Sequence, residues 1–130
     1  MQVQTFLSNV ASGCCLALCY LHIVGVTEDI KKIELLWKAM DRGIIKKDGY
    51  VNDAGALLRL ATNKSFNVIK PTDYNEDKPV IAKWEYTDDD NEHHEHFVII
   101  NGKDKKVIWN PLDYSNCVAK GKITSYRVVV

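Results

Sequence analysis

The sequence has no excess of charge of either sign and no apolar run long enough to cross a bilayer. Its 130 residues contain 17 Lys and Arg against 17 Asp and Glu, so the chain as a whole offers no electrostatic attraction to nucleic acid or to anionic lipid. The apolar stretch from Cys14 to Val26 covers 13 residues, whereas a spanning helix needs about 20. We therefore expect neither a nucleic-acid partner nor a membrane partner.

Features of a secreted protein are also missing. No Lys or Arg precedes Lys31 and no apolar segment precedes Cys14, so VASGC at residues 10–14 is not expected to be a lipoprotein cleavage box. There are only four cysteines, and three of them, Cys14, Cys15 and Cys19, stand within six residues, which is too close for a disulfide framework. Reduced thiols and a cytoplasmic location are expected.

Several common catalytic and cofactor motifs are absent. The sequence contains no glycine-rich phosphate loop, no serine-centred nucleophile elbow and no HExxH pattern. We expect no cofactor, and any catalytic chemistry must come from other side chains.

What is present is a chain with the size and composition of one globular domain, residues 1–130, with 46% hydrophobic and 26% charged residues. In the first half, residues 14–24 are apolar all round and predict a buried helix that ends at Gly25. Thr27 is expected to cap a second helix that stops near Gly43, with Ile30, Ile33, Leu36, Trp37 and Met40 at helical spacing. A turn-bearing segment, GIIKKDGYV, and a third helix over about 53–61, capped by Asn52, follow.

The second half changes to segments rich in β-branched and aromatic residues. Five strands are predicted, at 66–70, 79–87, 96–101, 105–110 and 123–130, and a polar loop, DDDNEHHEH, precedes the third of them. Short connections favour antiparallel pairing. The predicted fold class is α+β, with N-terminal helices packed on one face of a C-terminal antiparallel sheet.

Two adjacent cysteines, Cys14 and Cys15, stand at the predicted start of the first helix. A helix N-terminus and a nearby imidazole are the features that turn a thiol into a nucleophile. His96 begins a predicted strand, and a tight turn around Gly102 would bring Asn110 on the next strand beside it. An Asn there can accept the imidazole N–H and orient the ring. These residues predict a Cys-His-Asn triad.

At these residues the sequence resembles the papain-like cysteine peptidase superfamily, with a Cys at the head of a buried helix, then a His that opens a strand, then an Asn on the following strand. One similar branch is the leader-peptide-cleaving domains of bacteriocin exporters, whose segments correspond to HFVII and WNP here. The other is a group of small spirochaete and phage-associated proteins. Its pattern is matched by Gly13-Cys14, Gly43 to Asp53, His96 to Ile99, Asn110-Pro111-Leu112, Ser115, Gly121-Lys122-Ile123 and Tyr126-Arg127.

This resemblance implies a papain-like fold and a thiol hydrolase, a peptidase or amidase, or an acyltransferase that acts on a protein or peptide. Cys14 would be the nucleophile, with Cys15 as the alternative. Papain-like enzymes usually place a Gln six residues before the nucleophile; Ser8 and Asn9 occupy that place before Cys14 and Cys15. Asn9 can supply the oxyanion donor on a shorter side chain, and loss of such a donor costs about 3 kcal/mol of barrier.

Two other interpretations stay open. The missing Gln and the doubled Cys fit a binding module of the same fold that has lost catalysis, a phage- or plasmid-borne protein directed at a host protein. Alternatively, His94 and His96, two apart on one strand, could bind a metal. No Cys-x-x-Cys or second His pair completes a four-ligand structural site, and Cys14 and Cys15 can also be plain core residues.

Overall fold

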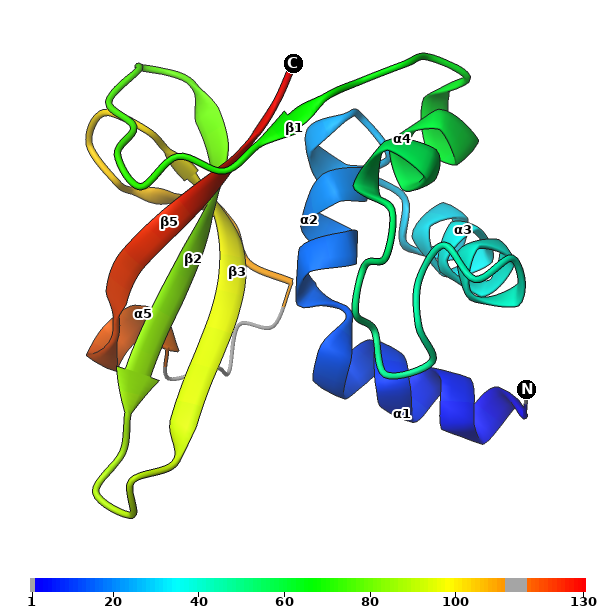
Figure 1. The fold of residues 1–130 in the computed structure, drawn as a ribbon, viewed down its shortest axis with the longest axis horizontal. Coiled ribbons are helices and arrows are strands. Elements are labelled where there is room, and N and C mark those ends of the chain that lie inside the picture. The colour runs from blue at the N-terminus through cyan, green and yellow to red at the C-terminus, as the bar shows by residue number, and fades with distance from the viewer. Residues whose placement is uncertain (1, 112–116) are drawn as a thin grey trace. The chain divides into compact units, whose positions relative to one another are not determined.

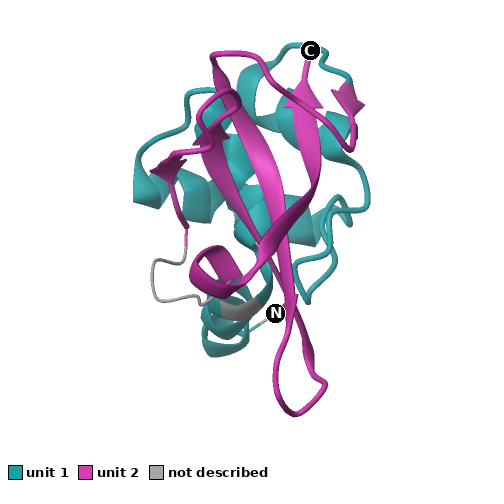
Figure 2. Ribbon diagram, turned by 90° about the vertical axis from the view of Figure 1, so that its left-hand side faces the viewer, with its two compact units in different colours: residues 1–67 teal, residues 68–130 magenta. Residues whose placement is uncertain are grey.

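The computed structural model describes residues 2–111 and 117–130, which form two compact units, Met1–Asn67 and Val68–Val130 (Figures 1 and 2). The first unit is helical and the second contains the sheet, as the change of sequence period predicted. The assignment of residues 1–130 to a single domain stays a prediction.

The helical unit contains α1 (Val3–Gly13), α2 (Cys15–Ile23), α3 (Asp29–Asp41) and α4 (Ala54–Thr62). Helix α2 packs against the other three helices, which explains why its sequence is apolar on every side. Ala17, Cys19, Tyr20 and Leu21 are buried on it. The predicted buried helix at residues 14–24 is confirmed, with Cys14 as its N-cap.

The other helices correct several details of the sequence interpretation. Helix α1 was not predicted. Glu28 rather than Thr27 occupies the N-cap position of α3, without a side-chain cap hydrogen bond. Asp53 rather than Asn52 caps α4, because the Asp53 carboxylate accepts the Ala56 N–H at 3.0 Å. The side chain of Ile30 on α3 is 73% exposed and that of Ile33 is 39% exposed.

The segment between α3 and α4 turns back on itself, as GIIKKDGYV suggested. Ile45 and Val51 form an isolated antiparallel bridge, and Gly49 at the turn has φ +97°. A Cβ at Gly49 would overlap the carbonyl group of Gly13 and reach the backbone nitrogen of Cys14. Only glycine permits this approach, and the turn thereby fixes the backbone where α1 ends and α2 begins.

The second unit is a five-stranded sheet in the order β1-β5-β2-β3-β4, with every neighbouring pair antiparallel. Its strands are β1 (Val68–Ile69), β2 (Pro79–Thr87), β3 (His93–Asn101), β4 (Val107–Trp109) and β5 (Lys122–Val129), and α5 (Cys117–Lys120) lies between β4 and β5 in the chain. The antiparallel α+β class is confirmed. The finer papain-like arrangement stays a prediction.

The core of the sheet unit lies on one face of β2, β3 and β5. Its buried residues are Val80, Ala82, Val98, Ile100 and Tyr126, and Val118 of α5 packs against them together with Tyr74, Trp84, Ile123 and Val128. Helix α5, which the sequence did not reveal, contacts β2 and β3. Helix α5 therefore covers this face of the sheet within the unit.

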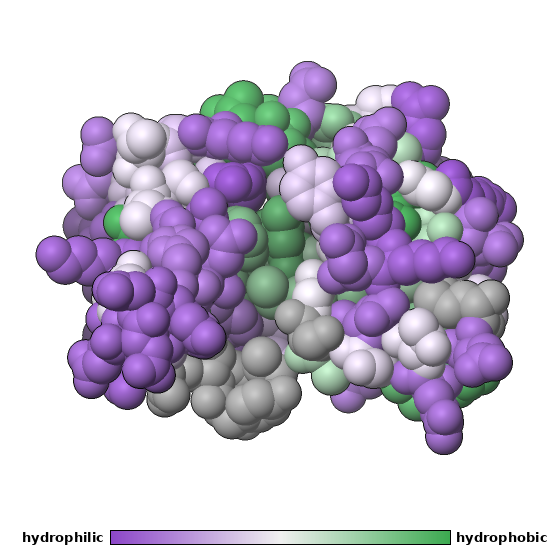
Figure 3. Space-filling view, turned by 60° about the horizontal axis from the view of Figure 1, so that its bottom comes forward, coloured by the Kyte–Doolittle hydropathy of each residue, from purple (hydrophilic) through white to green (hydrophobic). Residues whose placement is uncertain are grey.

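The polar loop predicted at residues 88–96 is shorter than expected. His93 to His96 belong to β3 and pair with β2, so that Thr87 faces His93 and Trp84 faces His96. The prediction of a loop there is wrong because the cross-strand partners, which a local pattern does not contain, extend the ladder. The polar end of this hairpin comes forward on the left of Figure 3 as a hydrophilic surface.

Among the described residues no single helix is long and apolar enough to span a membrane. Helices α1 and α2 reach the necessary length and composition only when taken together, across a bend of 80° between Val3–Ala11 and Cys15–Ile23.

Candidate functional site

His96 and Asn110 are brought together in the sheet unit. His96 lies on β3 with only 2% of its surface exposed, and Asn110 follows the last residue of β4. Nε2 of His96 lies 2.7 Å from Oδ1 of Asn110. The expected pairing of an imidazole with an amide on the next strand is confirmed as a direct hydrogen bond.

This hydrogen bond fixes the tautomer of the ring. An amide oxygen only accepts, so Nε2 of His96 must carry the proton that is donated to Asn110. In the neutral ring Nδ1 then holds the free lone pair and is the basic nitrogen. The pair therefore presents a base of defined orientation, which is the contribution that an Asn makes to a catalytic histidine.

The register of β3 and β4 shows how the two side chains meet. Ile99 pairs with Trp109 and Ile100 with Val107, with an irregularity between the two rungs. Asn110 therefore does not lie directly opposite His96, but it points to the same face of the sheet because side chains alternate along a strand. The two side chains meet diagonally across that face.

Burial keeps His96 neutral. Removal from water lowers the pKa of His96, and the hydrogen bond to Asn110 acts in the opposite direction with the smaller effect. The ring is thus unprotonated near neutral pH, which is the form that can accept a proton. It is not a preformed imidazolium.

Trp84 stands directly opposite His96 on β2. Its indole Nε1 is buried and has no hydrogen-bond partner among residues 2–111 and 117–130. A buried donor without a partner is rare in folded proteins. Because Trp84 and His96 share one rung of the β2–β3 ladder, this unpaired donor belongs to the cross-strand neighbour of the imidazole.

Cys14 and Cys15 belong to the helical unit, at the N-terminus of α2. The structure gives the two thiols different surroundings: Cys14, the N-cap, is completely buried, whereas Cys15, the first helical residue, is partly exposed. Burial raises the pKa of Cys14 to about 11, and the neighbouring Cys15 and Asp48 add to the shift. A thiol in this state is a poor nucleophile at neutral pH.

The remaining residues of interest are placed as follows. Asn9, the expected oxyanion donor, lies half-buried on α1 in the same unit as the two adjacent cysteines. Cys117 is a buried thiol on α5 of the sheet unit. Leu112 and Ser115, which contributed to the resemblance, lie outside the described residues.

The predicted metal pair, His94 and His96, does not share a ligand set. His94 Nε2 lies 2.8 Å from Oδ2 of Asp88, while Nε2 of His96 is engaged by Asn110. In the part of the chain that the structure describes, two groups place three metal-ligating atoms within 4.8 Å of one another, and neither contains His96. They are Glu85, His93 and Glu95, and Asp88, Glu92 and His94.

The first of these groups was not predicted because Glu85 lies on a different strand from His93 and Glu95. Once β2 and β3 are paired, Glu85 faces Glu95 directly. The register alone would have revealed this opposition, since a strand end at Thr87 and a short turn place residue 85 beside residue 95.

Comparison with known proteins adds a family but no activity. No curated protein and no solved structure matches the chain. A family model described as "Protein of unknown function, DUF261" matches residues 2–130, which is nearly the whole chain, and the protein therefore belongs to the DUF261 family.

Proposed function

We propose that the protein is a thiol hydrolase or acyltransferase of papain-like type, in which His96, oriented by Asn110, is the general base. The observation that carries this proposal is the 2.7 Å hydrogen bond from His96 Nε2 to Asn110 Oδ1. The bond leaves Nδ1 as the basic nitrogen of a buried, neutral ring.

In the proposed reaction a cysteine thiol gives its proton to Nδ1 of His96 as its sulfur attacks a substrate carbonyl carbon. The tetrahedral intermediate collapses to a thioester, and the leaving amine takes the proton from His96. Water then hydrolyses the thioester, or an acceptor amine takes the acyl group. The substrate would be a protein or peptide amide bond.

The sequence favoured Cys14 as the nucleophile. The exposure of the two adjacent thiols favours Cys15 instead. Cys15 is partly exposed at the first position of α2, where the helix N-terminus stabilises a thiolate. Cys14 is sealed from solvent and its pKa is raised to about 11. In this proposal Asn9 donates to the oxyanion, and a reducing, cytoplasmic location keeps the nucleophile reduced.

The second candidate is a non-catalytic binding module of the same fold, acting on a host protein. The complete burial of Cys14 favours it, as does the absence of a Gln six residues before either thiol. A module of this kind needs the fold but no reactive thiol.

Site-resolved alkylation separates the two candidates. The full-length protein is treated with limiting iodoacetamide between pH 6 and 9, and mass spectrometry measures the rate at each of the four cysteines. A hydrolase is expected to show one thiol that reacts faster than free cysteine near pH 7, and His96→Ala should reduce that rate about tenfold or more. Asn75→Ala, an exposed substitution in the same unit, is the control.

The enzymatic proposal fails if every thiol reacts at or below the rate of free cysteine and His96→Ala changes none of the rates. That result supports the binding module. A fast thiol at Cys117 with slow Cys14 and Cys15 would also overturn the assigned nucleophile, because Cys117 lies in the sheet unit and is not at the N-terminus of α2.

A further inference from the structure

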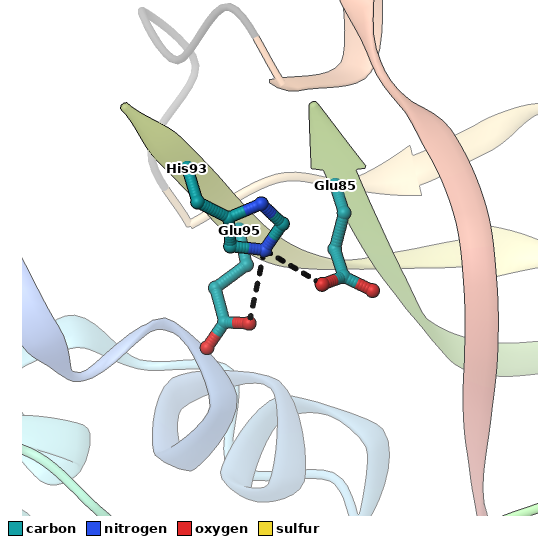
Figure 4. A group of neighbouring side chains, drawn as sticks. All are labelled: Glu85, His93 and Glu95. Atoms are coloured by element: carbon teal, nitrogen blue, oxygen red, sulfur yellow. Dashed lines mark hydrogen bonds and ion pairs between the residues drawn. The ribbon is translucent and has the colours of Figure 1, made fainter. Parts of the chain in front are cut away.

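We propose that Glu85, His93 and Glu95 form a binding site for a divalent transition-metal ion of the Zn²⁺ type on the β2–β3 hairpin (Figure 4). This inference does not rest on the proposed thiol chemistry.

The register of the hairpin builds the site. Glu85 on β2 directly faces Glu95 on β3, and His93 stands two residues before Glu95. Because side chains alternate along a strand, all three point to one face, opposite to the face of His94 and His96. The site is therefore separate from the His96–Asn110 pair.

The three donor atoms are already close together. His93 Nε2 lies 2.8 Å from Glu85 Oε1 and 4.0 Å from Glu95 Oε2, and all three atoms lie within 4.8 Å of one another. Ligands bound at about 2.0–2.2 Å from a zinc ion are separated by similar distances. Figure 4 shows the imidazole between the two carboxylates, with Nε2 turned toward both.

One carboxylate is held in place from outside the group. The hydroxyl of Thr124 on β5 donates to Oε2 of Glu85, so that Oε1 remains directed at His93. The same hydrogen bond is the main reason why the pKa of Glu85 lies below its ordinary value. Partners of this kind orient the ligands of metal sites and are a large part of their affinity.

The carboxylates on this face of the hairpin favour the binding of a cation. Two glutamates directly opposite each other on neighbouring strands repel. Lys83, on the same face, supplies a positive charge, with its Nζ 3.2 Å from Glu95 Oε2 and 3.9 Å from Glu85 Oε1. Lys83 is therefore a built-in competitor of the metal.

The ligand set selects the class of ion. One imidazole with two carboxylates suits Zn²⁺ and similar ions better than Mg²⁺ or Ca²⁺, which prefer oxygen ligands alone. Three protein ligands on an exposed hairpin leave the fourth position to water or to a further ligand.

The neighbouring group of Asp88, Glu92 and His94 is the weaker candidate. Oδ1 of Asp88 accepts the backbone N–H groups of Asp90 and Glu92, and this closes the turn between β2 and β3. Oδ2 of Asp88 forms a hydrogen bond with His94. The His94 ring stacks on Tyr86 with the ring centroids 4.7 Å apart. These groups have a structural role in the turn that binding a metal would disturb.

Isothermal titration of the untagged full-length protein with ZnCl₂ tests the site, under a non-chelating reductant and with MgCl₂ in parallel. We expect one Zn²⁺ site that weakens at least about tenfold in His93→Ala and in Glu95→Gln, because even loss of an orienting partner costs about 10–100-fold. His94→Ala is the matched control and should bind as the wild type does. Lys83→Met should bind more tightly.

All four cysteines remain in each of these variants, so zinc held by thiols does not change between them and is subtracted by the comparison. The proposal is overturned if no zinc binds, if His93→Ala and Glu95→Gln both bind as tightly as the wild type, or if the loss follows His94→Ala instead. Tight binding of Mg²⁺ at the same residues would overturn the choice of ion.

Discussion

Oδ1 of Asn110 accepts a hydrogen bond from Nε2 of His96 at 2.7 Å, beside two strands whose pairing is irregular between Ile99 and Ile100. The ring is thereby held in one tautomer by a residue just beyond the end of β4. Its environment is apolar, with Val98 and Ile100 on the same strand face. An oriented, buried imidazole is the feature on which the proposed function depends.

Asn110→Ala is expected to release this orientation. His96 then loses the acceptor of its Nε2 proton, and its neutral form should become a mixture of the two tautomers. Long-range ¹H–¹⁵N NMR of the imidazole reports the tautomer directly, and urea unfolding should show a loss of about 1 kcal/mol. Asn75→Ala should change neither measurement. An unchanged His96 spectrum in Asn110→Ala would contradict the role given to this hydrogen bond.

Cys14 should stay unreactive well above neutral pH. Its pKa is raised to about 11, so about one molecule in a thousand carries the thiolate at pH 8. Alkylation of Cys14 should therefore lag behind that of free cysteine until the pH approaches 11. In urea the same residue should react as ordinary cysteine does, which provides the internal reference. Labelling of native Cys14 ahead of Cys15 at pH 7.5 would show that the buried thiol, and not the partly exposed one, is the accessible nucleophile.

Gly49→Ala should damage the start of α2 more than its backbone conformation alone explains. Gly49 and Gly25 have nearly the same φ, +97° and +99°, but a Cβ at Gly25 meets nothing within 4 Å, while one at Gly49 overlaps the backbone of Gly13. Gly25→Ala should cost about 1–2 kcal/mol for the left-handed backbone. Gly49→Ala should cost about 1–3 kcal/mol more for the overlap. Equal losses of unfolding free energy in the two variants, measured in urea, would show that the turn at Gly49 is not in close contact with the backbone before α2.

The elements of this fold that could be predicted are those with a local sequence pattern. The apolar residues around α2 and the β-branched run of β2 are local patterns, and both elements were predicted within about one residue. Helix α1 carries exposed apolar residues, such as Val3 and Leu7, so its apolar residues do not mark a single buried face in the sequence. Helix α5 has four residues, which is too short for any pattern to identify.

In the candidate site, too, only the features with a local sequence pattern could be predicted. The pairing of His96 with Asn110 was predicted from a strand, a tight turn and a second strand, and the structure confirms the hydrogen bond although the pairing of β3 with β4 is irregular. The state of the two thiols could not be predicted, because burial is a property of the packed helices and not of the Gly-Cys-Cys segment. The opposition of Glu85 and Glu95 was likewise invisible before β2 and β3 were aligned.

A buried lysine beside a histidine should make the helical unit sensitive to acid. Lys32 is only 3% exposed, and its Nζ lies 3.0 Å from Nδ1 of His22. An ammonium group only donates, so Nδ1 accepts and His22 must be neutral. Burial first, and then the charge of Lys32, lower the pKa of His22, against an opposing effect of Asp29. Protonation of His22 would place two cations together in a site shielded from water.

Because the folded-state pKa of His22 lies below the unfolded value of about 6.5, the stabilisation is complete above that pH and is lost as the pH falls through the folded-state value. The free energy of unfolding should therefore decrease between pH 7 and pH 5 more steeply in the wild type than in His22→Asn, measured by urea unfolding at each pH. Lys32→Met should reduce the slope in part, since it removes the charge but not the burial. Equal slopes in the wild type and His22→Asn would mean that this pair does not control the acid response, and a wild type that gains stability relative to His22→Asn on acidification would reverse the assigned protonation state.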